Sequence, residues 1–319
     1  MNWLHRLLLH IGLYRRFVAW TKTIILRGFA PLSVYDIFAF ISHEIRDRIL
    51  INRASALAFN FMLAFFPATI FLFTLIPYVH LPNFQQNLLN LISTILPHNA
   101  YLAFQKTFED LVKHQNAKLL SAGFLSTLYF ATSGISNLMQ AFNKSSLIVE
   151  KRTWIKRRLI ATWLTVVIST LLLVAIAILA AGEKIIHGLR SLIVSKSHFW
   201  LYLITFSRWV IVIAIFFATI SLLYRYGPAN KKKWKFLSTG SILATVLAGI
   251  TSMGFTFYIN HFASYNKIYG SIGTLIILML YLYVNSLILL IGFELNANID
   301  YSKRTRKKPA KPKANTFKR

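Results

Sequence analysis

The last apolar run of the chain, residues 269–299, most constrains its fold and reads YGSIGTLIILMLYLYVNSLILLIGFELNANI. Between Ser271 and Phe293 this run contains no charged residue. A helix over those residues spans about 34 Å at about 1.5 Å per residue, which is enough to cross a bilayer core of about 30 Å. The run therefore predicts a transmembrane helix that ends at a carboxylate, Glu294.

The composition extends this prediction to the rest of the chain. Of the 319 residues, 56% are hydrophobic and only 14% are charged, whereas about 25% of the residues in a soluble domain are charged. A net charge of +27 on a soluble protein would indicate a nucleic-acid partner. Here the basic residues lie between apolar runs, as the positive-inside rule predicts for membrane proteins. The chain has no Cys, so disulfides and thiolate metal sites are excluded.

Charge alternation predicts the topology. The apolar runs that we expect to span the membrane are about 54–79, 119–142, 159–181, 199–224, 236–259 and 269–299. The connections 143–158 and 225–235 and both chain ends are strongly basic, whereas the other connections are close to neutral. Six spans place both termini on one side of the membrane, and the basic connections predict that this side is cytoplasmic.

The domain organisation follows from these runs. We expect cytoplasmic amphipathic helices over residues 1–53, with Ser33 and Asp36 forming a capping box, although the first part could also be an ordinary extension. Residues 54–299 should form the six-helix transmembrane domain, with a long outer loop at 80–118. Residues 300–319 are predicted to be a disordered basic tail attracted to anionic lipid, with RNA binding as the alternative. The expected lipid-surface contacts are Lys231, Lys232, Lys233, Lys307 and Lys308.

Glu294 and Arg208 are the charged candidates for a site within the spans. A carboxylate in a helix bundle should be paired or protonated, so we expect Arg53 or Asn60 as partners of Glu294, either as a structural lock or in proton coupling. Arg208 lies within the fourth run. It could snorkel to the interface or bind a lipid phosphate, with Glu183 as another potential partner.

Polar and helix-breaking residues inside the spans allow two interpretations. Thr132 and Ser133 could line a polar path, or they could mark close helix packing. The same alternatives hold for Pro67, Pro77 and Gly134, as helix breaks or as kinks and close-packing sites. A tight entry into the last span explains Tyr269, Gly270 and Gly273, and Asn296 is a further predicted structural position. No His pair in a span has metal-ligand spacing, and we expect neither a metal nor another cofactor.

Three stretches together resemble the YihY/BrkB family of bacterial inner-membrane proteins. They are residues 53–78 with Phe66-Pro67, residues 226–250, and residues 269–299 with Tyr269-Gly270 and Glu294-Leu295-Asn296-Ala297. The usual Gly-Ala-Glu-Leu-Asn pattern of the family reads Gly-Phe-Glu-Leu-Asn at 292–296 in this chain. The resemblance covers roughly residues 46–300 and implies six membrane helices with cytoplasmic termini in the bacterial inner membrane.

The resemblance says less about function. Family members have been called virulence factors, were once labelled ribonuclease BN, and are discussed as envelope lipid transporters. Our leading hypothesis is a transporter or flippase for a lipid or amphiphilic anion, linked to envelope integrity. The alternative is a non-transporting scaffold for envelope assembly or virulence. The acidic residues are too scattered for a metal-dependent nuclease site, so we expect no enzyme. We expect anionic membrane lipids as partners and no nucleic acid, and homo-oligomerisation stays open.

Overall fold

The computed structural model describes residues 12–24, 33–75, 105, 117–145, 150–192, 198–229, 234–261 and 271–306. These residues are helical apart from short connections, and no strand occurs among them. The helices are α2 (Gly12–Thr23), α3 (Val34–Glu44), α4 (Arg48–Leu75), α7 (Ala117–Ser145), α8 (Trp154–Leu192), α9 (His198–Tyr226), α10 (Thr239–His261) and α12 (Ser271–Arg306). The predicted all-α fold class is confirmed.

Six of the helices in the described ranges are long and apolar enough to cross a membrane. The candidate spans are Arg48–Phe71, Lys118–Lys144, Trp154–Ala175, Trp209–Tyr226, Thr239–Tyr258 and Leu275–Tyr301. Each overlaps one of the apolar runs in the sequence, with boundaries that differ by several residues, so the expectation of six membrane-spanning helices is confirmed at the level of length and composition. Large apolar side chains on them are exposed, among them Phe66, Leu125, Leu172, Val210, Ile250 and Leu280. Lipid is the environment in which such surfaces are stable.

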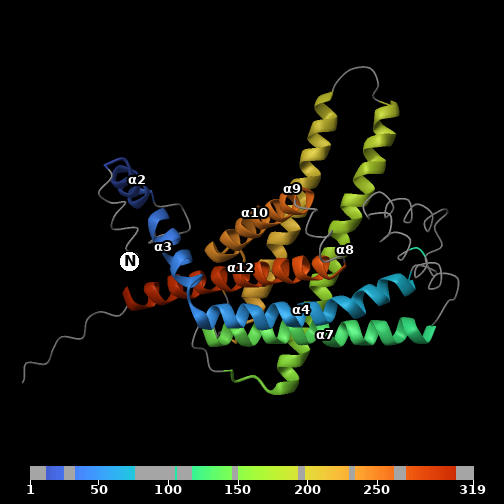
Figure 1. Cartoon of the computed structure of the whole chain (residues 1–319), viewed down its shortest axis with the longest axis horizontal. Helices are drawn as coiled ribbons and strands as arrows, with labels where there is room; N and C mark the ends of the chain where they lie inside the picture. The colour runs from blue at the N-terminus through green and yellow to red at the C-terminus, as the bar shows by residue number, and fades with distance from the viewer. Residues whose placement is uncertain are drawn as a thin grey trace, which may run out of the picture.

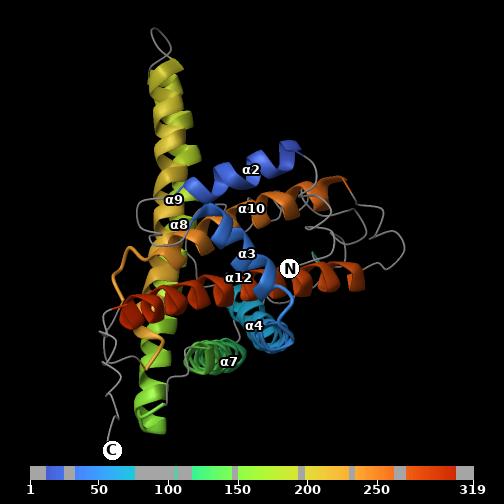
Figure 2. The same ribbon diagram turned by 90° about the vertical axis from the view of Figure 1, so that its left-hand side faces the viewer.

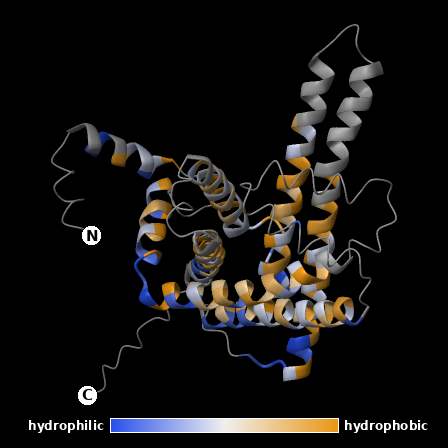
Figure 3. Ribbon diagram, turned by 45° about the vertical axis from the view of Figure 1, so that its right-hand side comes forward, coloured by the Kyte–Doolittle hydropathy of each residue, from blue (hydrophilic) through white to orange (hydrophobic). Residues whose placement is uncertain are grey.

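The six helices form two crossing sets (Figures 1 and 2). Helices α4 and α7 lie side by side, and α12 packs on α4 and on α10. The α8–α9 hairpin stands across the α4–α7 pair, so that the beginning of α8 passes the middle of α7. This crossing brings Arg158, the last basic residue before the third apolar run, against α7. Figure 3 shows that the start of α8 is hydrophilic and lies next to apolar helix faces.

The N-terminal capping box is confirmed in α3. The backbone N–H of Ser33 donates to Asp36 Oδ2 at 3.0 Å, and the backbone N–H of Asp36 donates to Ser33 Oγ at 3.2 Å. This amphipathic helix, α3, stops at Glu44, and α4 begins at Arg48, inside the segment 1–53 that the sequence assigned to cytoplasmic helices. Asp47 explains the start of α4, since its Oδ1 accepts the backbone N–H of Ile49 at 2.9 Å and so satisfies a first-turn donor.

The centre of the core is an aromatic cluster where the C-terminal parts of α7, α9 and α12 meet. The rings of Phe142 and Phe293 stack with centroids 4.1 Å apart, and Tyr224 meets both rings edge-on. Trp234, which precedes α10, packs on Phe293 with centroids 4.9 Å apart. Phe293 therefore fills a buried aromatic cluster at the position where the family pattern has a small residue. The adjacent Gly292 supplies the close approach to α10.

Candidate functional site

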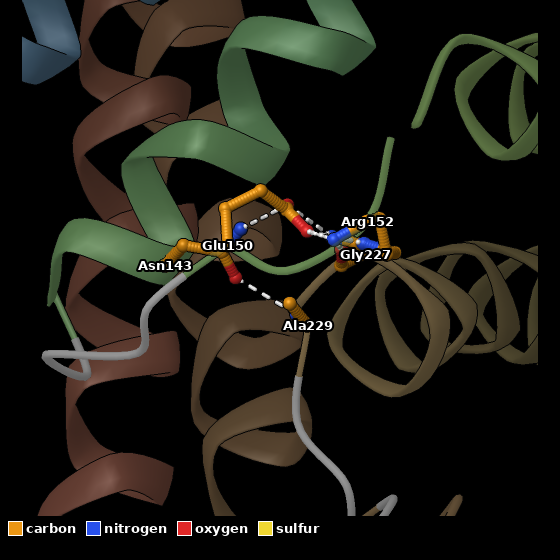
Figure 4. Close-up of polar contacts among 5 residues, drawn as sticks. All are labelled: Asn143, Glu150, Arg152, Gly227 and Ala229. Carbon is orange, nitrogen blue, oxygen red and sulfur yellow. Dashed lines mark hydrogen bonds and ion pairs between the residues drawn. The ribbon is translucent and has the colours of Figure 1, made fainter. Parts of the chain in front are cut away.

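A polar network ties together the connections that follow α7 and α9 (Figure 4). Arg152 donates twice to Glu150, from Nε to Oε1 at 2.8 Å and from Nη2 to Oε2 at 2.7 Å. Asn143, at the end of α7, donates from Nδ2 to Glu150 Oε2 at 2.7 Å. The Arg152 guanidinium lowers the pKa of Glu150 below its usual value, against the opposing effect of burial. Glu150 is therefore held ionised.

Arg152 and Asn143 also reach the connection between α9 and α10. Arg152 Nη2 donates to the carbonyl oxygen of Gly227 at 3.0 Å, and the backbone N–H of Ala229 donates to Asn143 Oδ1 at 2.8 Å. Asn143 is buried, with 4% of its surface exposed, and both of its amide atoms are hydrogen-bonded. The network is satisfied by protein groups, which is typical of a structural lock between two connections.

A different arginine lies on the surface of α7. Arg158 of α8 donates from Nη1 to Ser133 Oγ at 3.1 Å, and its Cζ lies 5.0 Å from the centre of the Tyr129 ring. Ser133 in turn donates to the carbonyl oxygen of Tyr129 at 2.8 Å. At about 1.5 Å per residue, Ser133 lies roughly 18 Å from the C-terminal end of α7. A fixed positive charge thus lies near the middle of a candidate span.

The guanidinium of Arg158 keeps donors for a ligand. An arginine has five N–H donors in a planar fork. In Arg158, Nη1 donates to Ser133 Oγ, and Nη2 makes one long contact of 3.5 Å with the carbonyl oxygen of Tyr129, so the other donors stay available. In the described part of the chain no carboxylate forms an ion pair with Arg158. Tyr129 beside it is exposed. The arrangement can bind an anion such as a phosphate group through paired N–H donors.

Sequence reasoning assigned Arg158 to a cytoplasmic connection and missed this position. The signal was weak, because Arg158 is the last of several basic residues before the apolar run that begins at Leu159. Its place beside Ser133 follows from the crossing of α8 over α7, which no local pattern encodes. The arginine chosen from the sequence, Arg208, belongs to α9. Its side chain, like that of Glu183, lies outside the described part of the structure.

Neither of the expected partners of Glu294 pairs with it. Asn60 donates from Nδ2 to the carbonyl oxygen of Ala56 in its own helix at 2.6 Å. Arg53 has no ion pair with any described residue. The predicted pairing with Glu294 is therefore not formed. Glu294 instead acts electrostatically on Glu44 of α3, whose pKa is raised by burial first and by the Glu294 charge second.

Thr132 and Gly134 flank Ser133 on α7 and face inward. Thr132 is buried, and its Oγ1 has no hydrogen-bond partner in the described part of the chain. A Cβ added to Gly134 would lie 3.1 Å from the Phe61 ring of α4, so this glycine permits close contact between the two helices. The structure thus places Thr132 and Gly134 in the packed interior and Ser133 at the Arg158 contact. Pro67 lies inside α4.

Asn296 of α12 serves the first turn of α10. Its Oδ1 accepts the backbone N–H of Gly240 at 2.7 Å, and its Nδ2 donates to Ser238 Oγ at 2.9 Å. These bonds satisfy N–H and hydroxyl groups at a helix start that is buried against α12. Of the other predicted positions, Gly273 is buried in α12. The remaining ones lie outside the described residues: Pro77, Tyr269, Gly270, Lys231, Lys232, Lys233, Lys307 and Lys308.

The fold and its apolar surfaces define the class first: this is a multi-pass membrane protein. The family is equally clear, because residues 41–316 match the virulence factor BrkB family, and the chain belongs to it. The resemblance seen in the sequence is thereby confirmed.

Relatives in other bacteria support this assignment. The chain is 30% identical over 253 residues to the ribonuclease-like protein YfkH of Bacillus subtilis, covering 79% of this chain and 91% of that one. It is 26% identical over 255 residues to a UPF0761 membrane protein of Tolumonas auensis, covering 77% of this chain and 79% of the relative. A UPF0761 membrane protein of Stenotrophomonas maltophilia is 25% identical over 265 residues, and the match spans 60% of that longer protein. No solved structure matches the chain.

Proposed function

We propose that this protein is a transporter or flippase for a lipid or another amphiphilic anion in the cytoplasmic membrane, with a role in envelope integrity. The observation that carries the proposal is the contact of Arg158 with Ser133 and Tyr129 on α7. A charged group near the middle of a span is costly and is usually retained for function. A guanidinium there can receive a phosphate from a headgroup moving along the helix face.

The surroundings of Arg158 suit an amphiphile better than a small soluble ion. Leu125 on α7 and Leu159 on α8 are 64% and 65% exposed, and they flank the residues that hold Arg158. An acyl chain can lie against such apolar surface while its phosphate contacts the guanidinium. Tyr129 offers an amphipathic ring between the two environments. These features support a lipid or lipid-like substrate.

Flux in reconstituted vesicles tests the proposal. Proteoliposomes would contain acyl-labelled phosphatidylglycerol or phosphatidylcholine, and a membrane-impermeant quencher would report the arrival of label in the outer leaflet. We expect faster exchange of the anionic lipid with the protein present. Arg158→Gln should reduce the rate about tenfold or more, because it removes a charged hydrogen bond to phosphate. Lys156→Gln is the matched control, since it removes a charge from an exposed side chain of the same helix.

The alternative, a non-transporting scaffold, predicts the opposite effect of Arg158→Gln. A scaffold that acts through its outer loop should keep its cellular phenotype in Arg158→Gln and lose it when residues 80–118 are deleted. Equal exchange rates with and without protein, for anionic and zwitterionic lipids alike, would rule out the flippase. The ribonuclease-like name belongs to the Bacillus relative. In this chain the described residues contain no group of three His, Asp or Glu side chains able to hold a metal ion, so our proposal includes no nuclease activity.

A further inference from the structure

Helix α2 packs with one face and presents the other face outward. Val18 and Thr21 are buried, whereas Arg16, Trp20 and Thr23 are exposed on the opposite side of the helix, with 60% of the Trp20 surface accessible. The three exposed residues are spaced by four and three positions and therefore share one face. Helix α2 carries three basic residues and no acidic one. Its outward face is thus basic and aromatic.

Two contacts hold α2 on α3. The backbone N–H of Val34 donates to the carbonyl oxygen of Ile24, directly after α2, at 3.0 Å. Lys22 Nζ lies 4.8 Å from the centre of the Tyr35 ring, which is a cation–π contact. These contacts leave the outward face of α2 uncovered. We call the two helices together the N-terminal arm.

Helix α3 fixes the arm at the ends of two candidate spans. Ile37 of α3 forms a buried apolar cluster with Leu295 and Ile299, which lie near the C-terminal end of the span in α12. Only residues 45–47 separate α3 from α4, which begins the first candidate span. The arm is therefore attached to the protein where α4 begins and α12 leaves its apolar segment.

The arm lies crosswise to α4 (Figures 1 and 2). Figure 1 shows α2 nearly end-on while α4 runs in the plane of the picture, and Figure 2 shows the reverse. A helix that lies crosswise to a transmembrane helix, at the end of that helix, follows the membrane surface. Tryptophan is enriched at this surface, and basic residues beside it are attracted to anionic lipid.

We propose that the outward face of α2 rests on the surface of a membrane that contains anionic lipid, with Trp20 among the headgroups and Arg16 facing their phosphates. The sequence predicted amphipathic helices in this region, and the structure adds the face that meets the lipid and the two spans that it anchors. A second copy of the chain fits this face less well, because a symmetric contact would bring two basic faces together. The inference does not depend on transport at Arg158.

A fluorescent label beside Trp20 tests the proposal in the full-length protein. The chain has no Cys, so Thr23→Cys gives a single labelling position on the outward face of α2. The labelled protein is placed, as a single copy per disc, in nanodiscs of phosphatidylcholine with or without phosphatidylglycerol. Nitroxide-labelled lipid quenches the label where α2 meets the lipid surface. We expect strong quenching and blue-shifted emission with phosphatidylglycerol, and a weaker effect with phosphatidylcholine alone.

Substitutions at exposed positions separate the two contributions. Arg16→Gln should lower the ratio of lipid-bound to released arm about fivefold in discs with phosphatidylglycerol, as expected for one basic residue at an anionic surface. Trp20→Ala should lower the quenching in both kinds of disc, because the ring prefers the interface irrespective of headgroup charge. Lys118→Gln is the matched control and should change neither, since it removes an exposed charge at the end of α7 that lies away from the arm (Figure 1).

Three results would overturn the proposal. The first is a label that stays unquenched in both kinds of disc. The second is equal quenching in both, unaffected by Arg16→Gln, because the face would then recognise no lipid charge. The third is a label that becomes shielded only in discs that hold two copies of the protein, which would show that a second copy covers α2.

Discussion

Gly240 of α10 and Gly292 of α12 bring the two helix backbones into direct contact. A Cβ on Gly292 would lie 2.7 Å from the carbonyl oxygen of Gly240 and 2.6 Å from the Tyr224 hydroxyl oxygen, and a Cβ on Gly240 would collide with the Gly292 carbonyl. Tyr224 closes the same contact from α9 by donating to the carbonyl oxygen of Leu289 at 2.7 Å. Three helices therefore meet where only glycine fits.

Alanine at either glycine should destabilise the protein. We expect Gly240→Ala and Gly292→Ala to lower the free energy of unfolding by about 1–3 kcal/mol, because a backbone carbonyl oxygen of the facing helix obstructs each new Cβ and cannot move aside cheaply. Gly249→Ala and Gly254→Ala on α10 are matched controls, since nothing lies within 4 Å of a Cβ there. They should raise stability by about 0.5–1 kcal/mol through helix propensity. Thermal unfolding in detergent measures the losses and the gains. Equal effects at all four glycines would contradict the close contact of Gly240 with Gly292.

The cap that Asn296 provides to α10 should be measurable. Asn296→Ala leaves the buried N–H of Gly240 without an acceptor, and we expect a loss of about 1–2 kcal/mol. Asn296→Asp keeps the acceptor and should lose less. Asn298→Ala, at an exposed position of the same helix, is the control. Amide hydrogen exchange at the start of α10 should quicken in the Ala variant alone, and an unchanged exchange rate would refute the cap.

The Arg152–Glu150 pair should make stability fall in acid. The pKa of Glu150 is lowered in the folded state by Arg152. The pair's contribution is therefore full above the ordinary carboxyl pKa and is lost as the pH falls through the lowered folded pKa. Glu150→Gln should be less stable than wild type at neutral pH, and the difference should shrink at low pH. A difference that is constant from neutral to acid pH would show that Glu150 does not titrate with folding.

The pKa of Glu44 should change when Glu294 is replaced. Burial and then the Glu294 charge raise the pKa of Glu44. The ionised Glu44 therefore weakens the fold as the pH rises above its unfolded pKa. Glu294→Gln should lower the pKa of Glu44 partway toward its usual value, because burial remains. Measured against pH, the free energy of unfolding should fall less between acid and neutral pH in the variant than in wild type. An unchanged profile would show that the charge of Glu294 does not affect Glu44.

Membrane topology remains a prediction from charge. A reporter fused after Arg319 should be active in the cytoplasm, and one inserted near Asn99 should be active in the periplasm, because the basic connections stay on the cytoplasmic side. Detection of both reporters on one side would contradict six spans.

The sequence alone determined the spans, because each apolar run is long enough to cross a bilayer and has little charge to keep it in water. It also determined the Ser33–Asp36 cap, which needs only residues three apart. The sequence did not predict that Arg158 lies beside Ser133 or that Asn143 binds the α9–α10 connection. It also did not predict that Arg53 and Glu294 stay unpaired with each other. The contacts of Arg158 with Ser133 and of Asn143 with Ala229 join different helices and connections. Only the tertiary structure decides them, because they depend on how the helices cross, and the periodicity of the sequence does not specify the crossing of two helices.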